Sequence, residues 1–197
     1  MKKVVAIVMA SGFGRRMKLA ENKLLLPANG RLLFMHTLDV IKVTGMAAMV
    51  VTSVPEIASY ARELGFGCTD NPRRQEGISA AIRQGIAACG EGFDGYMFFS
   101  CDQPFLRAAV IEELLRAFAR ETAVIVPRVN EKTYSPCIFP VQYKQELLAL
   151  TGEQGGKYIL RKDPACIFVD FSNARDFFDV DTAEDFAQMK DIFHRRI

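Results

Sequence analysis

The sequence predicts an α/β protein in which helices cover both faces of a mostly parallel sheet. Apolar runs of strand length alternate along the chain with segments of helical periodicity, which is the pattern typical of such sheets. The chain has 197 residues, of which 50% are hydrophobic and 24% are charged, so it can bury one sizeable core. We therefore expect residues 1–197 to form a single domain.

The predicted elements alternate almost regularly in chain order. Strands are expected at Val4–Met9, Met46–Ser53, 66–69, Gly95–Ser100, 122–127, 137–139 and 166–171. Helices are expected at Leu32–Val43, Pro55–Leu64, Ile78–Gly90, Ala108–Arg120, Gln142–Leu150 and Lys157–Arg161, and a last helix is expected from Thr182.

Several boundaries rest on local chemistry. Pro55 suits the first turn of a helix, and Gly90 is a helix stop signal. Two prolines flank the run "CIF", which predicts a short edge or antiparallel strand. Either Asp181 or Thr182 can cap the last helix, whose first turn carries acidic residues that favour the helix dipole.

Charge and cysteine usage exclude some classes of function. Lys plus Arg number 25 and Asp plus Glu number 23, so no general basic field attracts nucleic acid. The five cysteines are widely spaced and odd in number, which indicates reduced thiols rather than a disulfide framework. The first apolar run is too short for a signal peptide or a membrane span. We expect a cytoplasmic protein that binds neither nucleic acid nor membranes.

The loop after the first strand, "ASGFGRRMKLAENKLLLP", is shaped for an anion. Glycine lets backbone N–H groups approach phosphate oxygens closely, and two cations can neutralise phosphate charge. A flexible loop with solvated arginines is the alternative interpretation. The residues expected to bind a nucleotide polyphosphate here are Ala10, Ser11, Gly12, Phe13, Gly14, Arg16 and Lys23.

Two familiar phosphate motifs are incomplete in this loop. "GFGRRM" begins like a dinucleotide-binding fingerprint, but Met17 stands where the third glycine belongs. No acidic residue ends the second strand to hold a ribose, and the P-loop pattern is absent. The sequence therefore argues against a hydride-transfer enzyme and against a P-loop ATPase or kinase.

Carboxylates follow two later segments. Asp102 comes directly after the buried strand Gly95–Ser100, where it is well placed to bind Mg²⁺ with substrate phosphates; it could instead end the strand or cap a helix. Asp179 and Asp181 alternate at strand spacing, and Asp181, then Asp179, is a candidate second ligand. Cys101 could be a nucleophile, although cysteine at a strand end more often packs in the core.

Together, "MASGFGRRM" with Lys23, "DQP" after an apolar strand, "EGISAAIRQGI" and the late "DVDTAED" resemble the MobA-like nucleotidyltransferase superfamily, most closely its molybdenum cofactor cytidylyltransferase branch. The resemblance implies a three-layer α/β/α Rossmann-like nucleotidyltransferase fold. It also implies that Gly12, Arg16 and Lys23 grip the triphosphate and that Asp102 holds Mg²⁺. "EGISAAI" matches the segment that contacts base and sugar, which points to Gly77 and Ser79, although Ser79 could equally be an N-cap.

The reaction that this resemblance implies is transfer of CMP from CTP to the terminal phosphate of molybdopterin, with release of pyrophosphate. No side-chain nucleophile is required, and an acceptor phosphate that is largely ionised near neutral pH needs no general base. Arg16, Lys23 and Asp102 would be the catalytic residues. The client of the product would be a molybdenum hydroxylase.

Departures from the family pattern leave the acceptor open. Lys18 replaces a usual glycine, Ser11 replaces the usual Ala or Gly, and Glu153 and Lys157 stand where the family tends to have Asp and Arg. The segments 134–136 and 152–157 are expected to face the acceptor. The alternatives are a guanylyltransferase on the same cofactor, a sugar or alditol phosphate nucleotidyltransferase, and a non-catalytic carrier of the pterin.

Overall fold

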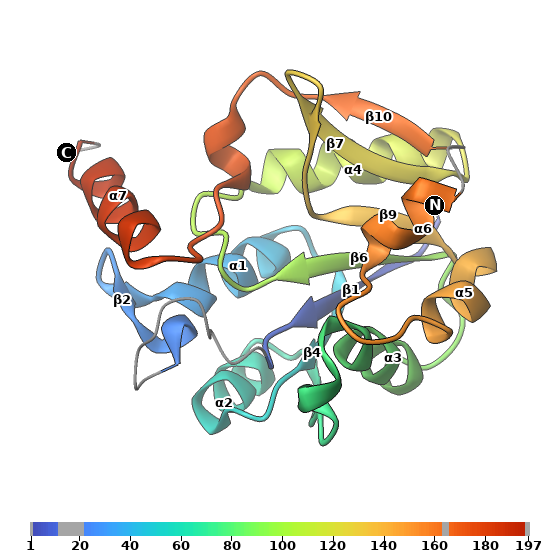
Figure 1. Ribbon diagram of the computed structural model, residues 1–197, viewed down its shortest axis with the longest axis horizontal. Helices are drawn as coiled ribbons and strands as arrows, with labels where there is room; N and C mark the ends of the chain where they lie inside the picture. Colours follow the sequence, from blue (N-terminus) through green and yellow to red (C-terminus); the bar gives the residue numbers. More distant parts are fainter. Residues whose placement is uncertain (1, 12–21, 163–165, 196–197) are drawn as a thin grey trace.

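A mixed eight-stranded sheet lies at the centre of the protein in the computed structural model, which describes residues 2–11, 22–162 and 166–195 (Figure 1). Its order is β10-β7-β9-β6-β1-β4-β5, and β8 pairs with β7. The strands are β1 Val4–Met9, β4 Ala47–Val51, β5 Gly67–Thr69, β6 Gly95–Ser100, β7 Val124–Val129, β8 Lys132–Thr133, β9 Cys137–Pro140 and β10 Cys166–Asp170.

The predicted fold class is confirmed. The pairs β1–β4, β4–β5, β1–β6 and β7–β10 are parallel, whereas β9 runs antiparallel to both β6 and β7. β1 reads as a continuous apolar run because helices cover both faces of the sheet there, which leaves neither face of this strand open to water.

Helices form the two outer layers. One face of the sheet packs against α1 Leu33–Val43, α2 Pro55–Glu63 and α4 Ala108–Arg120. The other face packs against α3 Ile78–Ala88, α5 Lys144–Leu148 and α6 Gly156–Lys162. Alternate residues of β1 belong to the two cores, because successive strand side chains point to opposite faces. The three layers of the predicted architecture are therefore present.

The last helix, α7 Ala183–His194, lies beside a small hairpin of β2 Pro27–Ala28 and β3 Arg31–Leu32 (Figure 1). A small apolar cluster that includes Ala28, Phe105 and Met189 joins them. The predicted cap is confirmed: Thr182 accepts a hydrogen bond from the N–H of Asp185, whose carboxylate accepts from the N–H of Thr182. This capping box fixes where α7 starts.

Some boundaries differ from the expectations. A short edge or antiparallel strand was expected at 137–139, and β9 is antiparallel as expected but lies inside the sheet rather than at its edge. Pro136 precedes it and Pro140 is its last residue, so neither proline interrupts its middle. The helix expected at Gln142–Leu150 begins as a 3₁₀ turn over Val141–Tyr143. Within the described residues, no helix is long and apolar enough to cross a membrane.

Four parallel strands end level with one another. In the register, Met9 pairs with Ser100 of β6 and with Val51 of β4, and Val51 pairs with Thr69 of β5. The chain leaves β1 toward β4 on one side and returns to β6 on the other, so the strand order reverses between β1 and β6. In open α/β sheets, ligands bind at such a switch point, outside the carboxyl ends of the strands.

Candidate functional site

The first predicted segment begins at the carboxyl end of β1, where neighbouring strands fix it. The N–H of Ala10 donates to the carbonyl of Val51 at 2.9 Å, and the Thr52 hydroxyl donates to the carbonyl of Ala10 at 3.0 Å. The Asn71 amide donates to Ser11 Oγ at 3.0 Å. Ala10 and Ser11 are thus held at the predicted place, while Gly12, Phe13, Gly14 and Arg16 lie outside the described residues.

Lys23 opens a short 3₁₀ helix, Lys23–Leu25, that the side chain of Asn22 caps. Its ammonium donates to Asp102 Oδ2 at 2.7 Å, to Asp181 Oδ1 at 2.8 Å and to the carbonyl oxygen of Val180 at 2.9 Å. The side chains of Lys23 and Asp102 are only 12% and 13% exposed. The structure therefore joins a cation and two carboxylates that the sequence places far apart.

The two carboxylates come from segments that are tied together. Asp102 follows β6 and Cys101, and its carbonyl accepts the N–H of Val180 at 2.9 Å, which holds the segment before α7 against the end of β6. Asp179 and Asp181, which alternate at strand spacing in the sequence, lie in an irregular segment between a 3₁₀ turn, Ala174–Phe177, and α7. Asp181 and Asp102 nevertheless accept hydrogen bonds from the same ammonium, while the metal that they were expected to share stays a prediction.

Burial and charge shift the protonation of two of these groups. Burial lowers the pKa of Lys23, but its ion pairs and hydrogen bonds with Asp102 and Asp181 outweigh that effect, so the pKa is raised above its usual value. Loss of hydration, together with the nearby charge of Asp102, raises the pKa of Asp179 to about 6, although Asp179 is among the exposed residues and solvent therefore weakens this effect. The ammonium of Lys23 is therefore firmly charged, and Asp179 titrates near neutral pH.

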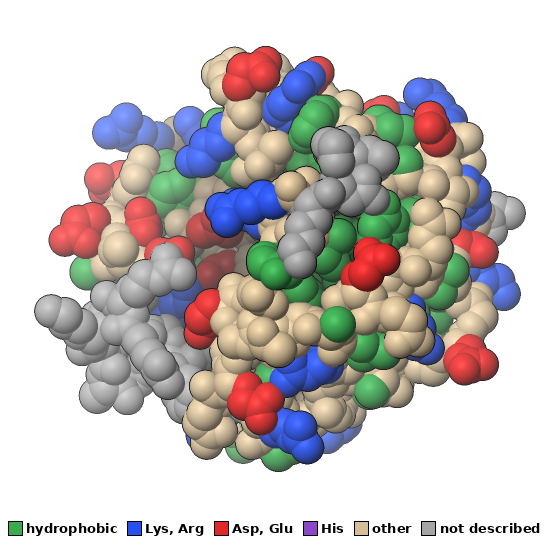
Figure 2. Space-filling model, turned by 45° about the vertical axis from the view of Figure 1, so that its right-hand side comes forward, with side chains coloured by type: hydrophobic (Ala, Val, Ile, Leu, Met, Phe, Trp, Pro, Cys, Tyr) green, Lys and Arg blue, Asp and Glu red, His purple; other side chains and the backbone are tan. Residues whose placement is uncertain are grey.

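The donor atoms fit a divalent cation whose coordination substrate phosphates would complete. Asp102 Oδ1 is buried and has no hydrogen-bond partner among the described residues. Mg²⁺ is usually bound by one or two carboxylates plus phosphate oxygens, and Asp102 and Asp181 supply such a pair. The described part of the chain contains no group of three or more acidic, His or Cys side chains able to hold a metal. Figure 2 shows acidic side chains deep in a hollow on one face of the molecule.

The segment predicted to contact base and sugar packs against a segment predicted to face the acceptor. Gly77 has φ +89°, and a Cβ there would meet the carbonyl oxygen of Gly152 at 2.5 Å. The N–H groups of Ile78 and Ser79 donate to the Glu153 carboxylate and to the Gly152 carbonyl. These two oxygens therefore pair with backbone N–H groups in the first turn of α3.

Ser79 does not act as an N-cap. It is fully buried, and its hydroxyl oxygen accepts a hydrogen bond from Arg83 Nη1 at 3.1 Å. Gly77 holds the cap position of α3, without a capping side chain. The contact that the family resemblance predicts between Ser79 and a nucleotide stays a prediction.

The other segment expected at the acceptor lies next to Asp102 in the fold. Gln103 is buried, and its Nε2 donates to the carbonyl and the hydroxyl oxygen of Ser135, both at 3.2 Å. The ring of Tyr134 stacks on Phe177 with centroids 5.0 Å apart. Sequence reasoning missed Gln103 as a link between these segments; its position between Asp102 and Pro104 was the available signal.

The cysteines offer no obvious nucleophile. All five are free, and Cys101 is buried in the core, which raises the pKa of its thiol. Burial likewise raises the pKa of Cys137 to about 12. Both thiols are therefore protonated near neutral pH, as expected of cysteines that serve packing.

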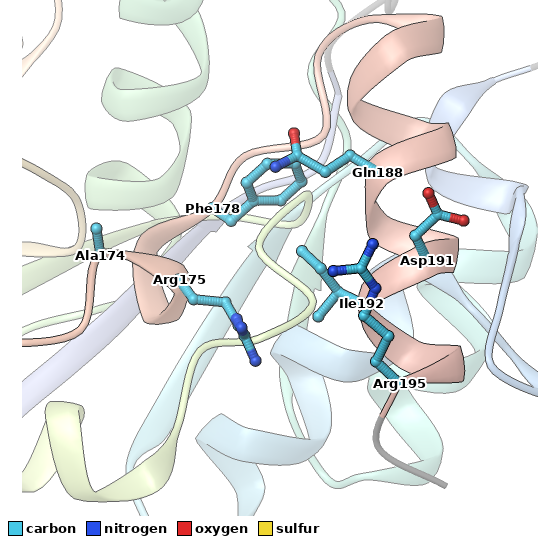
Figure 3. A pocket seen from close by; sticks show the side chains of 7 residues that line it. All are labelled: Ala174, Arg175, Phe178, Gln188, Asp191, Ile192 and Arg195. Carbon is cyan, nitrogen blue, oxygen red and sulfur yellow. The ribbon is translucent and has the colours of Figure 1, made fainter.

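A pocket of about 460 Å³ lies elsewhere, between α7 and the 3₁₀ turn that precedes it (Figure 3). It is lined by Ala174, Arg175, Phe178, Gln188, Asp191, Ile192 and Arg195. None of the residues that the sequence singled out lines this pocket. The candidate site is therefore the group around Lys23 at the carboxyl ends of β1 and β6.

Comparisons with known proteins identify the family of the chain. Residues 6–166 match the family described as "MobA-like NTP transferase domain". "Bifunctional protein GlmU" of Paramagnetospirillum magneticum is 32% identical over 127 residues, which are 63% of this chain and 28% of that protein. The chain thus spans well under half the length of the curated relatives it matches.

Solved structures share the fold. Rv0371c of Mycobacterium tuberculosis in complex with manganese superposes with a TM-score of 0.75 at 21% identity, covering 96% of this chain and 99% of that one. A molybdopterin-guanine dinucleotide biosynthesis protein A of Archaeoglobus fulgidus gives 0.74 at 16% identity, covering 98% and 99%.

Proposed function

The chain belongs to the MobA-like NTP transferase domain family, and on this premise we propose that it transfers CMP from CTP to the terminal phosphate of molybdopterin. An oxygen of the acceptor phosphate forms a new bond to the α-phosphorus of CTP. The bond from that phosphorus to the oxygen bridging to the β-phosphorus breaks, and pyrophosphate leaves with the bond's electron pair.

The observation that carries this proposal is the ion cluster of Lys23, Asp102 and Asp181 at the switch point of the sheet. A cation beside two carboxylates suits a substrate that arrives as a complex of phosphates and a divalent cation. A bound Mg²⁺ or Mn²⁺ would supply charge stabilisation on the α-phosphate and on the leaving group. Asp102 and Asp181 would hold that cation.

The other predicted residues bind CTP, the nucleotide donor. Backbone N–H groups of Ser11, Gly12 and Gly14 bind phosphate oxygens, and Arg16 and Lys23 neutralise the charge of the leaving pyrophosphate. Gly77 and the buried Ser79 lie on the side of the site that takes the base and sugar of CTP. No side chain has to give or take a proton, since the second pKa of a phosphate monoester is about 6.

The acceptor in this proposal is molybdopterin. Tyr134–Pro136 and Gly152–Lys157 line its side of the site, and a molybdenum hydroxylase in the cytoplasm is the proposed client of the product. A guanylyltransferase on the same cofactor is the second candidate, because the solved Archaeoglobus fulgidus protein is described as a molybdopterin-guanine dinucleotide biosynthesis protein. The base pocket is where the two candidates differ.

Pyrophosphate release with CTP, GTP, ATP and UTP, each with and without molybdopterin, tests the proposal. We expect release only when CTP and molybdopterin are both present with Mg²⁺ or Mn²⁺. Faster release with GTP would favour the guanylyltransferase. Release with sugar phosphates in place of molybdopterin would move the acceptor to that class, and no release with any pair would refute the transferase activity on these acceptors.

A further inference from the structure

The ammonium of Lys23 is saturated in this structure. An ammonium has three N–H donors, and those of Lys23 have three acceptors at hydrogen-bond distance, namely Asp102 Oδ2, the Val180 carbonyl and Asp181 Oδ1, at 2.7 to 2.9 Å. No donor is left over for a phosphate oxygen. Lys23 can therefore bind a triphosphate only after it gives up at least one of these bonds.

The same oxygens are those that a divalent cation would need. Mg²⁺ and Mn²⁺ take oxygen ligands, and Asp102 and Asp181 are the carboxylates that face the ammonium. A lysine ammonium and a metal ion cannot occupy the space between these carboxylates together, because two cations repel each other at that distance and the ammonium already contacts Asp102 Oδ2 and Asp181 Oδ1. The arrangement makes the two cations competitors.

One carboxylate oxygen at the site makes no hydrogen bond with the lysine. Asp102 Oδ1 is buried without a partner among the described residues, which is unusual for a carboxylate oxygen. Lys23 satisfies only the other oxygen of this carboxylate. A metal ion in place of the ammonium could engage Oδ1, so the carboxylate is better matched to the metal than to the lysine.

We propose that Lys23 is a resident counter-ion that holds the metal site closed to free metal, and that nucleoside triphosphate opens it by drawing the ammonium onto its phosphates. This inference rests on the proposed function, whose substrate carries the required phosphates. Metal alone must displace the lysine and binds weakly. Triphosphate alone would draw the ammonium away from two carboxylates and add its own negative charge beside theirs, so it too binds weakly. When both bind, the triphosphate draws the ammonium away from the carboxylates and the metal ion neutralises them. Each ligand therefore raises the affinity of the other by the same factor.

Binding of Mn²⁺ to the nucleotide-free protein, followed by electron paramagnetic resonance, tests this directly. In Lys23→Met, which keeps the length of the side chain and removes its charge, we expect Mn²⁺ to bind about 5- to 150-fold more tightly than in the parent protein, the usual range of a coupling between sites. The double variant Lys23→Met with Asp102→Asn should lose this gain. Lys42→Met removes an exposed charge on α1 and should leave Mn²⁺ affinity unchanged. Equal or weaker Mn²⁺ binding in Lys23→Met would overturn the proposal.

A second measurement follows the Lys23 ammonium in the parent protein and does not depend on the metal affinity of a variant. In the parent protein with ¹⁵N-labelled lysine, the ammonium resonance of Lys23, assigned by its loss in Lys23→Arg, should shift when CTP and Mg²⁺ are added together and hardly with CMP and Mg²⁺. A resonance that stays unchanged with CTP and Mg²⁺ bound would refute the exchange. Neither measurement uses turnover, so a protein that shows the exchange but transfers no nucleotide would refute the proposed function and leave this inference standing.

Discussion

Lys23, Asp102 and Asp181 show what a single sequence can indicate about a site. Lys23 was singled out as a cation in the glycine-containing loop after the first strand, Asp102 because it follows a buried strand, and Asp181 because it alternates with Asp179 before the last helix. Their mutual contacts were not predicted, since Lys23 was expected to face phosphates alone. The partners lie 79 and 158 positions away in the chain, and such contacts depend on how the strands are ordered.

Asp102→Asn tests the metal ligand at this scale. The change keeps the shape of the side chain but removes the charge that would hold a divalent cation, so we expect turnover to fall at least about 100-fold, the scale of losing a charge-stabilising group. The circular dichroism spectrum should stay that of the parent. Near-normal turnover at saturating Mg²⁺ would remove Asp102 from the metal site.

Lys23→Ala should weaken CTP far more than CMP. A cation aimed at the β and γ phosphates has nothing to hold in the monophosphate, and a charged hydrogen bond contributes about 1.5 to 3 kcal/mol, or roughly 10- to 150-fold in affinity. Calorimetric titration of both nucleotides with Mg²⁺ measures the difference. Equal weakening of CTP and CMP would place Lys23 away from the phosphates.

The raised pKa of Asp179 predicts how the stability of the folded protein changes with pH. Its pKa of about 6 in the folded protein lies above the unfolded value of about 3.9, so its charge destabilises the folded state above pH 6. That cost disappears as the pH falls from about 6 toward 4. Asp179→Asn should therefore be more stable than the parent at pH 7, with the gain lost near pH 4. Its size should stay well below the full linkage value because Asp179 is an exposed residue.

Urea unfolding at both pH values, without metal, makes this comparison. Asp170→Asn is the matched control, because Arg128 lowers the pKa of Asp170 and the shift has the opposite sign. The control should show no gain at pH 7. A gain in Asp179→Asn that is the same at pH 7 and pH 4 would contradict the account of its environment.

Among the elements, the long helices and buried strands were predictable and the shortest pieces were not. The β2–β3 hairpin has a signal that was overlooked: Asn29 and Gly30, both with positive φ, form the two-residue turn that favours such hairpins. The turn between β7 and β8 uses Asn130 and Glu131 at positive φ, and glutamate gives no such signal. The interior place of β9 was hidden because prolines usually indicate an edge.

Gly77→Ala tests the packing at the start of α3. At φ +89° an L-residue is strained, and the new Cβ would lie 2.5 Å from the carbonyl oxygen of Gly152, which is backbone and cannot rotate away. Gly90→Ala is the control, since it shares a positive φ of +81° and has nothing within 4 Å. We expect the control to cost about 1 to 2 kcal/mol in urea unfolding and Gly77→Ala to cost clearly more. Equal costs would mean that the approach of Gly152 is not tight.

For the whole molecule, the alternation of apolar runs with helical segments was enough to predict three layers, because parallel strands require crossover helices on the faces of the sheet. The order β10-β7-β9-β6-β1-β4-β5 was not predictable. It is set by packing between elements distant in sequence, which a single sequence does not reveal. Membership of the family matched by residues 6–166 is consistent with the resemblance seen in the motifs.

Nucleotide binding should stabilise the whole fold by mass action. At a hundred times the dissociation constant, a ligand adds about 2.7 kcal/mol, which for a domain of this size raises Tm by roughly 5 to 11 °C. We expect CTP with Mg²⁺ to give such a shift and NAD to give almost none. A thermal melt with each nucleotide measures it. Equal shifts with NAD and CTP would restore the dinucleotide-binding interpretation that the incomplete fingerprint argues against.

The most direct test of the account follows the α-phosphorus itself. CTP labelled with ³²P at the α position is incubated with molybdopterin, Mg²⁺ and either the parent protein, Asp102→Asn, or the surface control Asp170→Asn, and the products are separated. The account predicts that the label moves onto molybdopterin with the parent and the control, with release of unlabelled pyrophosphate, and stays in CTP with Asp102→Asn. Label that stays in CTP with the parent protein, or that moves as fast with Asp102→Asn, would contradict nucleotidyl transfer at this site.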